Sequence, residues 1–219
     1  MFVAVPVNGI WWPASVLTVM QVVARAGGTF SLERDNPWID RARANCVNDF
    51  LLTNEPELLF IDSDTWFDPE IVTTMQAAKA DVITCTYRQR NPPHKFVAAT
   101  LGGGKDVPTE LRNSPVRMVD GKRVVEIERD GLGCCLIQRR VIEKLCVPEL
   151  EYVSTDSGRR AWNLFEYGIT EVDGVRRAGA EDRAFFKRVR DAGFKVECLI
   201  DATIVHGGIA GRFADLLNG

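Results

Sequence analysis

Several features that mark common protein classes are missing from this sequence of 219 residues. Lys and Arg number 27 against 30 Asp and Glu, and no long basic run exists, so a formal net charge of −3 argues against a general binder of nucleic acids or anionic membranes. No apolar run approaches the roughly 20 residues of a membrane-spanning helix. No G-x-S-x-G segment is present either, so a hydrolase built on that motif has no support.

The six cysteines form no C-x-x-C pair, and they are too few for a disulfide scaffold in a chain of this length. We therefore expect them to be small apolar core residues in a reducing compartment. The opening "MFVAVPV" reads as a strand, with neither a basic segment nor a cleavage site. These absences together predict a cytoplasmic protein with no transmembrane segment.

The residues that are present follow an α/β pattern in the first half of the chain. Apolar residues make up 46% and charged residues 26%, which is ordinary for a globular chain, and the length favours one domain. The pattern predicts strands at 2–7, 57–62 and 81–87, and helices at 13–28, at 39–54 and from Asp68-Pro69-Glu70 onward. Apolar strands alternating with helices are typical of a parallel sheet covered on both faces.

The second half is organised differently. The sequence predicts a hairpin at 116–128 around Asp120-Gly121, then a strand at 131–138 and a helix at 139–145. A stretch at 147–178 shows few periodic features, so we expect it to be irregular. A helix at 181–193, a strand at 194–200 and a short strand ending at Val205-His206 follow. The layout is α/β, with a parallel first half and a mixed sheet in the second.

Two carboxylates, Asp62 and Asp64, stand at the end of the most apolar strand. They converge if the backbone stays extended and diverge if it turns at Ser63. Either way they lie at the carboxyl end of a parallel strand, where open α/β sheets bind ligands. Adjacent carboxylates repel, and a hard cation such as Mg²⁺ or Mn²⁺ would compensate them together with diphosphate oxygens. The alternative is a solvated D-S-D segment that caps the following turn.

Two further sites carry candidate functional groups. Glu181 and Asp182 occupy the first turn of a predicted helix, where the helix dipole favours ionised carboxylates and where one could act as a general base. The alternative is plain stabilisation of the helix N-terminus. His206 ends the last predicted strand; it could ligate a metal, although a lone histidine there is more often structural. Trp11 and Trp12 could stack on a base or sugar, but their place at a helix entry favours packing.

In this order, these segments resemble the GT-A glycosyltransferases, in particular compact single-domain members like those of family 2 in bacteria, phages and large viruses. The resemblance runs through "IDRARANCVNDFLL", "ELLFIDSDTWFDPEIV", "ADVITCTY", "GLGCCLIQRRVIEKL", "EDRAFFKRVRDAGFKV" and "VHGG". It implies a GT-A fold with a mixed, mostly parallel central sheet flanked by helices. It also implies one catalytic domain over 1–219, with a nucleotide-binding half at 1–90 and an acceptor-side half at 91–219.

The resemblance also implies roles for particular residues. Asp64 would bind the divalent ion, with Asp62 nearer the ribose or the water shell of the metal, and His206 would complete the metal site. Asp182 matches the proposed catalytic base of inverting members, with Glu181 beside it near the acceptor.

On the nucleotide side, the resemblance places Pro6 and Asn8 where the family holds the base. Arg43 would contact the nucleotide or diphosphate. Ala44 stands where the family segment usually has Asn, which puts a polar contact there in doubt.

The expected function is metal-dependent transfer of a sugar from a nucleoside-diphosphate sugar, UDP by default, to a hydroxyl of a glycan, lipid-linked or other acceptor, with inversion. A sugar-nucleotide nucleotidyltransferase is one alternative, but "PVNGIWWPAS" lacks the Gly- and Arg-rich loop expected there. A degenerate binding protein of the same fold is another, although it would be expected to have lost one of the acidic residues or the late His. A nucleic-acid acceptor is not favoured by the net acidity.

Overall fold

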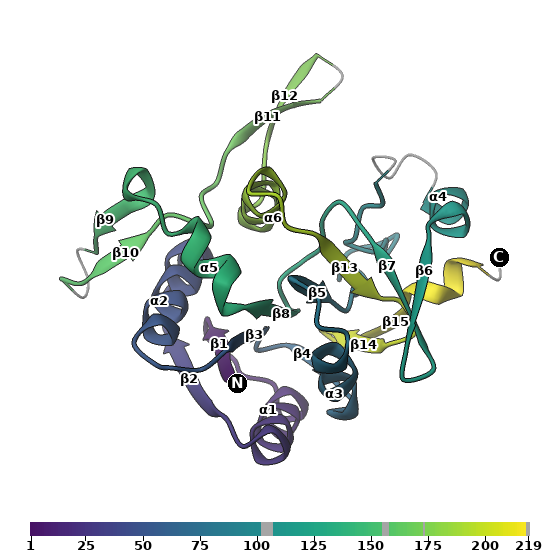
Figure 1. The fold of residues 1–219 in the computed structure, drawn as a ribbon, viewed down its shortest axis with the longest axis horizontal. Helices are drawn as coiled ribbons and strands as arrows, with labels where there is room; N and C mark the ends of the chain where they lie inside the picture. Colours follow the sequence, from purple (N-terminus) through teal and green to yellow (C-terminus); the bar gives the residue numbers. More distant parts are fainter. Residues whose placement is uncertain (102–106, 155–157, 173, 218–219) are drawn as a thin grey trace.

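The computed structural model describes residues 1–101, 107–154, 158–172 and 174–217. The strands of its main sheet are β1 (Phe2–Val7), β2 (Thr29–Arg34), β3 (Glu57–Ile61), β5 (Val82–Thr84), β6 (Val116–Val119), β7 (Lys122–Glu126), β8 (Cys134–Gln138) and β13 (Val196–Leu199). They lie in the order β2-β1-β3-β8-β5-β13-β7-β6 (Figure 1). Among these eight strands only β7 and β8 run against the others, so the sheet is mixed but mostly parallel in direction.

Helices cover both faces of this sheet. They are α1 (Pro13–Ala26), α2 (Ile39–Leu51), α3 (Glu70–Ala77), α4 (Val107–Asn113), α5 (Arg139–Leu145) and α6 (Glu181–Asp191). Figure 1 shows α1 and α3 on one side of the sheet and α2, α5 and α6 on the other. The predicted α/β class, with a mixed central sheet flanked by helices, is confirmed. None of the described helices is long and apolar enough to cross a membrane.

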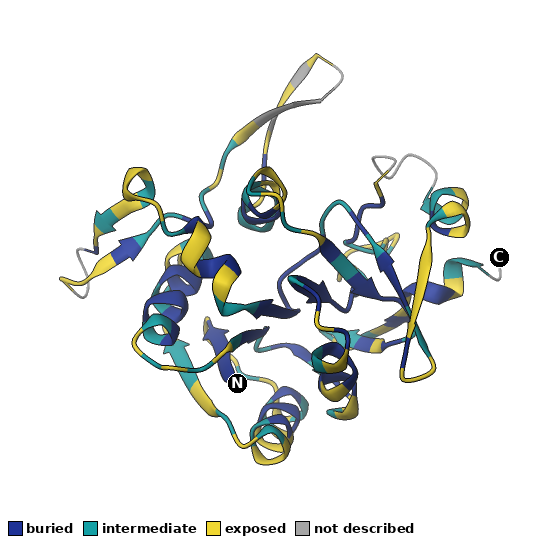
Figure 2. Cartoon of the chain, viewed as in Figure 1, coloured by how far each residue is buried: buried dark blue, intermediate teal, exposed yellow. Residues whose placement is uncertain are grey.

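Side chains that alternate along the strands build two apolar cores. In β1, Phe2 and Ala4 face α2, α5 and α6, whereas Val3, Val5 and Val7 face α1 and α3. Successive side chains of a strand point to opposite faces, so a strand buried on both sides must be apolar throughout. Figure 2 shows the resulting pattern, with buried strands at the centre and exposed residues on the outer surfaces of the helices.

Strand β8 ties the two halves of the chain into one sheet. It comes from the second half but pairs in the antiparallel sense with both β3 and β5. The sequence did not predict strand β2, because "TFSLER" carries no apolar run. This strand lies at the edge of the sheet, where it pairs with β1 alone, and its residues are half-buried or exposed.

Local turn signals are confirmed. Helix α1 ends at Ala26 because Gly27 adopts a left-handed backbone with φ 63°. The hairpin between β6 and β7 turns at Asp120 and Gly121, both with positive φ, as the predicted Asp-Gly turn requires. Five of the six cysteines are buried, and Cys146 is half-buried, so the expectation of small core side chains holds.

A second, smaller sheet brings the end of the chain to the carboxyl end of β3. Its strands are β4 (Thr65–Phe67), β14 (Thr203–His206) and β15 (Ile209–Arg212), in the order β15-β14-β4. Strand β4 begins directly after Asp64, and His206 of β14 pairs opposite Thr65. The backbone N–H of Gly207 also donates to the Asp64 carbonyl at 2.9 Å. A helical turn, η2 (Phe213–Leu217), follows.

The expectation that 147–178 is irregular is wrong for the described residues. A short helical turn, η1 (Pro148–Leu150), is followed by two antiparallel hairpins, one of β9 (Glu151–Val153) with β10 (Arg160–Trp162) and one of β11 (Ile169–Val172) with β12 (Val175–Ala178). Residues 155–157 and 173 lie outside the described part. Both hairpins project away from the main sheet (Figure 1), and their strands of three or four residues are too short to show a clear alternation of apolar and polar residues in the sequence.

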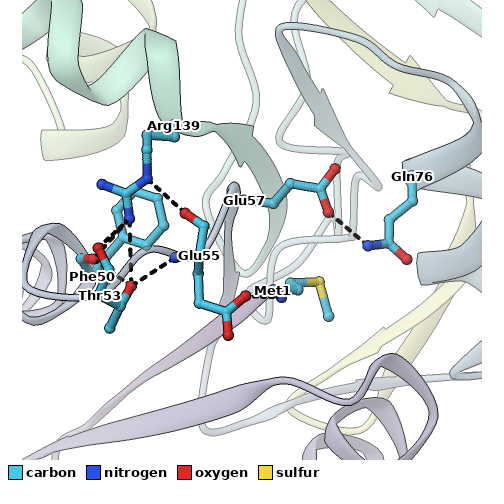
Figure 3. Close-up of polar contacts among 7 residues, drawn as sticks. All are labelled: Met1, Phe50, Thr53, Glu55, Glu57, Gln76 and Arg139. Carbon is cyan, nitrogen blue, oxygen red and sulfur yellow. Dashed lines mark hydrogen bonds and ion pairs between the residues drawn. The ribbon is translucent and has the colours of Figure 1, made fainter.

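A single arginine connects α5 to the C-terminal end of α2. The Arg139 guanidinium donates to the carbonyl oxygens of Glu55 at 2.7 Å, Thr53 at 3.0 Å and Phe50 at 3.1 Å, and its Cζ lies 4.2 Å from the centre of the Phe50 ring (Figure 3). The Phe50 carbonyl also accepts bonds from the Thr53 N–H and hydroxyl, so the guanidinium mainly supplies donors to the Thr53 and Glu55 carbonyls beyond the helix end. Arg139 therefore fixes the segment that enters β3.

We expect Arg139→Met to lower the free energy of unfolding by roughly 2–4 kcal/mol, because it removes the guanidinium that donates to the carbonyls of Thr53 and Glu55. Urea denaturation followed by circular dichroism measures the change. The matched control is Arg140→Met, which removes a neighbouring guanidinium that is 59% exposed and pairs with Asp81 at 2.5 Å. An exposed pair contributes less than about 1 kcal/mol. Equal losses in both variants would contradict the role given to Arg139.

Candidate functional site

A cleft of about 660 Å³ opens at the carboxyl ends of β1 and β3 and beside the segment that follows β5. These ends meet at the same edge because the three strands run parallel, which is where open α/β sheets bind ligands. Seven of the eight site residues named from the sequence line it: Pro6, Asn8, Arg43, Asp62, Asp64, Glu181 and Asp182. The eighth, His206, lies directly behind Asp64.

The chain turns at Ser63, so the two aspartates diverge. The Thr65 N–H donates to the Asp62 carbonyl at 3.0 Å and closes the turn. The Ser15 hydroxyl, on α1, also donates a hydrogen bond to the Asp62 carbonyl at 3.1 Å and so connects the turn to that helix. Of the two arrangements left open by the sequence, the structure has the one in which Asp62 and Asp64 face different partners.

Asp62 and Glu181 share one buried guanidinium. Arg43 Nη2 lies 3.0 Å and 3.4 Å from the two carboxylate oxygens of Asp62, and Arg43 Nε lies 3.7 Å from Glu181 Oε1. Arg43 is on α2, Asp62 follows β3 and Glu181 begins α6, so three elements distant in sequence meet at this cation. The Arg43 side chain is only 3% exposed.

The charge on Arg43 is set by its carboxylate neighbours. Burial alone would lower its pKa, but the negative charges of Asp62 and Glu181 outweigh burial, and its pKa is raised. Its Nε and Nη1 have no hydrogen-bond partner among the described residues. A buried donor without an acceptor costs about 1–3 kcal/mol, so this guanidinium is held at the cleft wall at an energetic cost.

Asp64 faces two groups that can carry positive charge. Its Oδ2 lies 2.7 Å from Arg90 Nη2 and 3.4 Å from His206 Nε2, yet neither neighbour donates a well-directed hydrogen bond to it. His206 Nδ1 is 3.0 Å from the Arg88 carbonyl, and the ring lies 4.5 Å from the Tyr87 ring. A hydrogen bond from Nδ1 to that carbonyl leaves Nε2 as a free lone pair pointing toward Asp64.

These two groups fit a divalent cation in part. Among the described residues no cluster of three or more His, Cys, Asp or Glu side chains could hold a metal. Asp64 Oδ2 is nevertheless a buried acceptor without a hydrogen-bond donor, beside an imidazole whose tautomer suits a ligand. A carboxylate oxygen and an imidazole suit Mn²⁺, with the remaining positions left to ligand oxygens and water.

Asp182 stands at the N-terminus of α6 on the opposite wall. The Arg183 N–H donates to its Oδ1 at 2.6 Å. Burial and the neighbouring Glu181 carboxylate raise the pKa of Asp182 to about 6. A carboxylate with that pKa is ionised at neutral pH yet basic enough to take a proton from a hydroxyl group, which suits a general base.

Two glycines that precede β8, Gly131 and Gly133, allow the backbone to pass close to the site residues. A Cβ atom at Gly133 would lie 2.9 Å from Asp62 Oδ2 and 2.9 Å from Tyr87 Cε1. A Cβ at Gly131 would lie 2.1 Å from the Tyr87 hydroxyl. The buried Asp130 holds this turn by accepting bonds from the Thr84 hydroxyl at 2.7 Å and the Gly131 N–H at 2.8 Å, and burial raises its pKa to about 7.

Several lining residues were not identified from the sequence as site residues. Tyr87, Arg90 and Leu132 line the cleft, and Asp130 supports it from beneath. For Arg90 a usable signal was its position shortly after a parallel strand. Trp12, expected to be a packing residue, stacks on Trp66 with ring centres 5.6 Å apart but is also 40% exposed at the cleft wall.

Comparisons with known proteins show the fold but no family. No family model matches the chain, and no curated protein does. The crystal structure of A197 from STIV is similar at 14% identity and a TM-score of 0.56, over 94% of this chain and 84% of that one. This likeness shows a shared fold.

Two further solved structures are similar at TM-scores below 0.5, which add no weight. S. aureus TarS 1-349 is 12% identical, at a TM-score of 0.45 over 90% of this chain and 57% of that one. A glycosyltransferase involved in the glycosylation of the major capsid of PBCV-1 is 10% identical, at 0.35 over 65% of this chain and 61% of that one.

The raised pKa of Asp182 predicts a pH dependence of stability. Its folded-state pKa of about 6 exceeds the ordinary value of 3.8, so it contributes stability below about pH 4 that is lost as the pH rises through 6. Asp182→Asn cannot show this loss. We therefore expect the variant to gain roughly 1–3 kcal/mol of unfolding free energy relative to wild type between pH 4 and pH 8.

Urea titrations at the two pH values measure this gain. Asp191→Asn, at the exposed end of the same helix, serves as the matched substitution. A stability difference between Asp182→Asn and wild type that is the same at both pH values would contradict the assignment.

Proposed function

We propose that this chain is a metal-dependent glycosyltransferase that moves a sugar from a nucleoside-diphosphate sugar to a hydroxyl acceptor, with inversion at the anomeric carbon. The observation that carries the proposal is that Arg43 bridges Asp62 and Glu181, so the carboxylates after β3 and those that open α6 face one cleft. The shared fold with A197 and the resemblance of the sequence segments to GT-A enzymes are consistent with it.

The donor side of the proposed site is built from residues at the strand ends. Pro6 and Asn8, at the end of β1, would hold the nucleotide base. Arg43 lines the cleft, and its guanidinium would contact an oxygen of the diphosphate or ribose. Asp64 and His206 would hold Mn²⁺ or Mg²⁺, which supplies Lewis-acid stabilisation of the charge on the departing diphosphate.

The acceptor side of the proposed site uses Asp182. Its carboxylate takes the proton of the acceptor hydroxyl while that oxygen forms a bond to the anomeric carbon. The bond from this carbon to the diphosphate oxygen breaks, and the electron pair leaves with the diphosphate. Attack opposite the leaving group inverts the anomeric centre. Glu181, held by Arg43, keeps a negative charge beside Asp182 and thereby helps to maintain its basicity.

The donor site is tested by thermal stability with UDP, GDP, CDP and ADP, each with and without Mn²⁺. A ligand at about 100 times its Kd stabilises the folded state by about 2.7 kcal/mol, which raises Tm by roughly 5–10 °C for a domain of this size. We expect such a rise for one nucleotide, dependent on Mn²⁺ and lost in Asp64→Ala.

Asp215→Ala, which removes a carboxylate of the exposed Arg212–Asp215 pair, is the control for loss of an acidic side chain. It should leave the Mn²⁺-dependent rise unchanged. If no nucleotide raises the Tm of wild type, the proposal fails and the fold is a binding module without a nucleotide site. A rise that survives Asp64→Ala would mean that the metal binds elsewhere.

The base is tested by the pH dependence of transfer. Because Asp182 acts ionised and its pKa is about 6, kcat/KM should rise through pH 6 and level off above pH 7. Asp182→Asn should lower kcat by about 10²–10⁴-fold while the nucleotide-induced rise in Tm remains. Radiolabelled sugar release from the donor, to acceptor or to water, provides the assay. Retention of full activity in the variant would remove Asp182 from the role of base.

A further inference from the structure

A second pocket adjoins the cleft and is lined by positive charge. It has a volume of about 490 Å³, and its charged lining residues are all basic: Arg88, Lys95, Arg129 and Arg183. Phe96 and Pro108 are among its apolar lining residues. Residues 102–106, which precede α4, lie outside the described part of the chain.

The basic side chains of this pocket make no close ion pairs within the described part of the chain. Among the described residues, none of the four makes an ion pair with a carboxylate within 4.0 Å, whereas Arg190, farther along α6, does pair with Glu128 at 3.9 Å. Burial, followed by the nearby Arg183, lowers the pKa of Arg129, although the carboxylates of Glu128, Asp182 and Asp130 offset part of this effect. Two guanidinium groups are thus held close enough to repel each other, an arrangement that an anion would stabilise.

The Arg88 side chain is held in place by contacts with three other residues of the chain. The Arg88 guanidinium lies 4.3 Å from the centre of the Phe96 ring and donates to the His94 carbonyl at 3.1 Å. Its aliphatic part packs against the backbone at Gly211, where a Cβ atom would lie 2.8 Å from Arg88 Cγ. A guanidinium held in this way binds an anion with little loss of side-chain freedom.

The same chain segments line both the pocket and the cleft. Tyr87 faces the cleft and Arg88 the pocket; Leu132 faces the cleft and Arg129 the pocket; Asp182 faces the cleft and Arg183 the pocket. The pocket therefore lies next to the cleft, and the adjacent residues Asp182 and Arg183 line one each.

We propose that this pocket binds an anionic group, phosphate or carboxylate, of the acceptor, so that a hydroxyl of the same molecule reaches Asp182. The acceptor class would then be an anionic polyol or sugar. This inference rests on the proposed glycosyl transfer for its functional meaning, but the anion site itself can be tested without it.

The test is titration calorimetry at pH 7.5 and low salt with paired probes that share hydroxyl groups and differ in charge. Glycerol 3-phosphate is compared with glycerol, and glucuronate with glucose. We expect the wild-type protein to bind at least one anionic probe about tenfold or more tightly than its neutral counterpart. The phosphate and carboxylate probes show which anion the pocket takes.

Variants locate the binding. Arg129→Met and Arg183→Gln should each raise the Kd of the anionic probe about tenfold or more, because each removes a charge-assisted hydrogen bond. Arg190→Gln removes the same charge from α6 outside the pocket and should change Kd less than about twofold. Arg129→Lys, which keeps the charge, should lose less than Arg129→Met and excludes misfolding as the cause.

The outcomes separate this inference from the proposed function. Unchanged binding in both pocket variants, an equal loss in Arg190→Gln, or no preference of wild type for either anion would overturn the anion site. The Mn²⁺-dependent rise in Tm with nucleotide should persist in Arg129→Met. Anion binding in a protein that no nucleotide stabilises would retain the pocket and reject glycosyl transfer.

Discussion

The buried guanidinium of Arg43 is the contact on which the geometry of the candidate site depends. It binds Asp62 at the end of β3 and faces Glu181 at the start of α6, and its own helix packs on the sheet between them. A buried ion pair contributes little net stability compared with apolar packing, because desolvation offsets the attraction. Its effect here is positional, because it brings α2, the end of β3 and the start of α6 together at one cation. Two nitrogens of this guanidinium, Nε and Nη1, are buried without a hydrogen-bond partner among the described residues.

The carboxylates of the site differ in the groups that surround them. Asp62 is matched with Arg43 and Asp64 lies against Arg90 and His206, whereas Asp182 has burial and a like charge beside it, which hold its pKa near 6. Groups of the same chemical type are thereby suited to different tasks, charge compensation on one wall and proton transfer on the other. The basic pocket beside Asp182 extends the division, because it gathers positive charge in a protein whose net charge is negative.

Close packing of backbone is the second constraint on the site. Tyr87 lies so close to Gly131 and Gly133, and Asp62 so close to Gly133, that a Cβ atom at either glycine would clash. Gly207, with φ +56°, lets the chain leave His206 and pass under Arg90. These positions explain why glycine pairs and a G-x-G segment stand next to the charged residues in the sequence. The buried Asp130 completes the arrangement by holding the turn before β8, although neither its burial nor its hydrogen bonds could be read from the sequence.

The sequence by itself determined the two-sided burial of the strands, the Gly27 helix end and the Asp-Gly hairpin, because apolar periodicity and glycine conformation are local properties. Charge placement pointed to Asp62, Asp64, Glu181, Asp182 and His206 as candidates, and the resemblance to GT-A enzymes added Pro6, Asn8 and Arg43. Only the tertiary structure decided that Asp62 and Asp64 diverge, that β8 joins the two halves, and that His206 reaches Asp64 through the pairing of β14 with β4. It also revealed the hairpins within 147–178 and the role of Arg90, which depend on contacts between residues far apart in the chain. Local sequence carries no record of such contacts, since their energy comes from the partner and not from the segment itself.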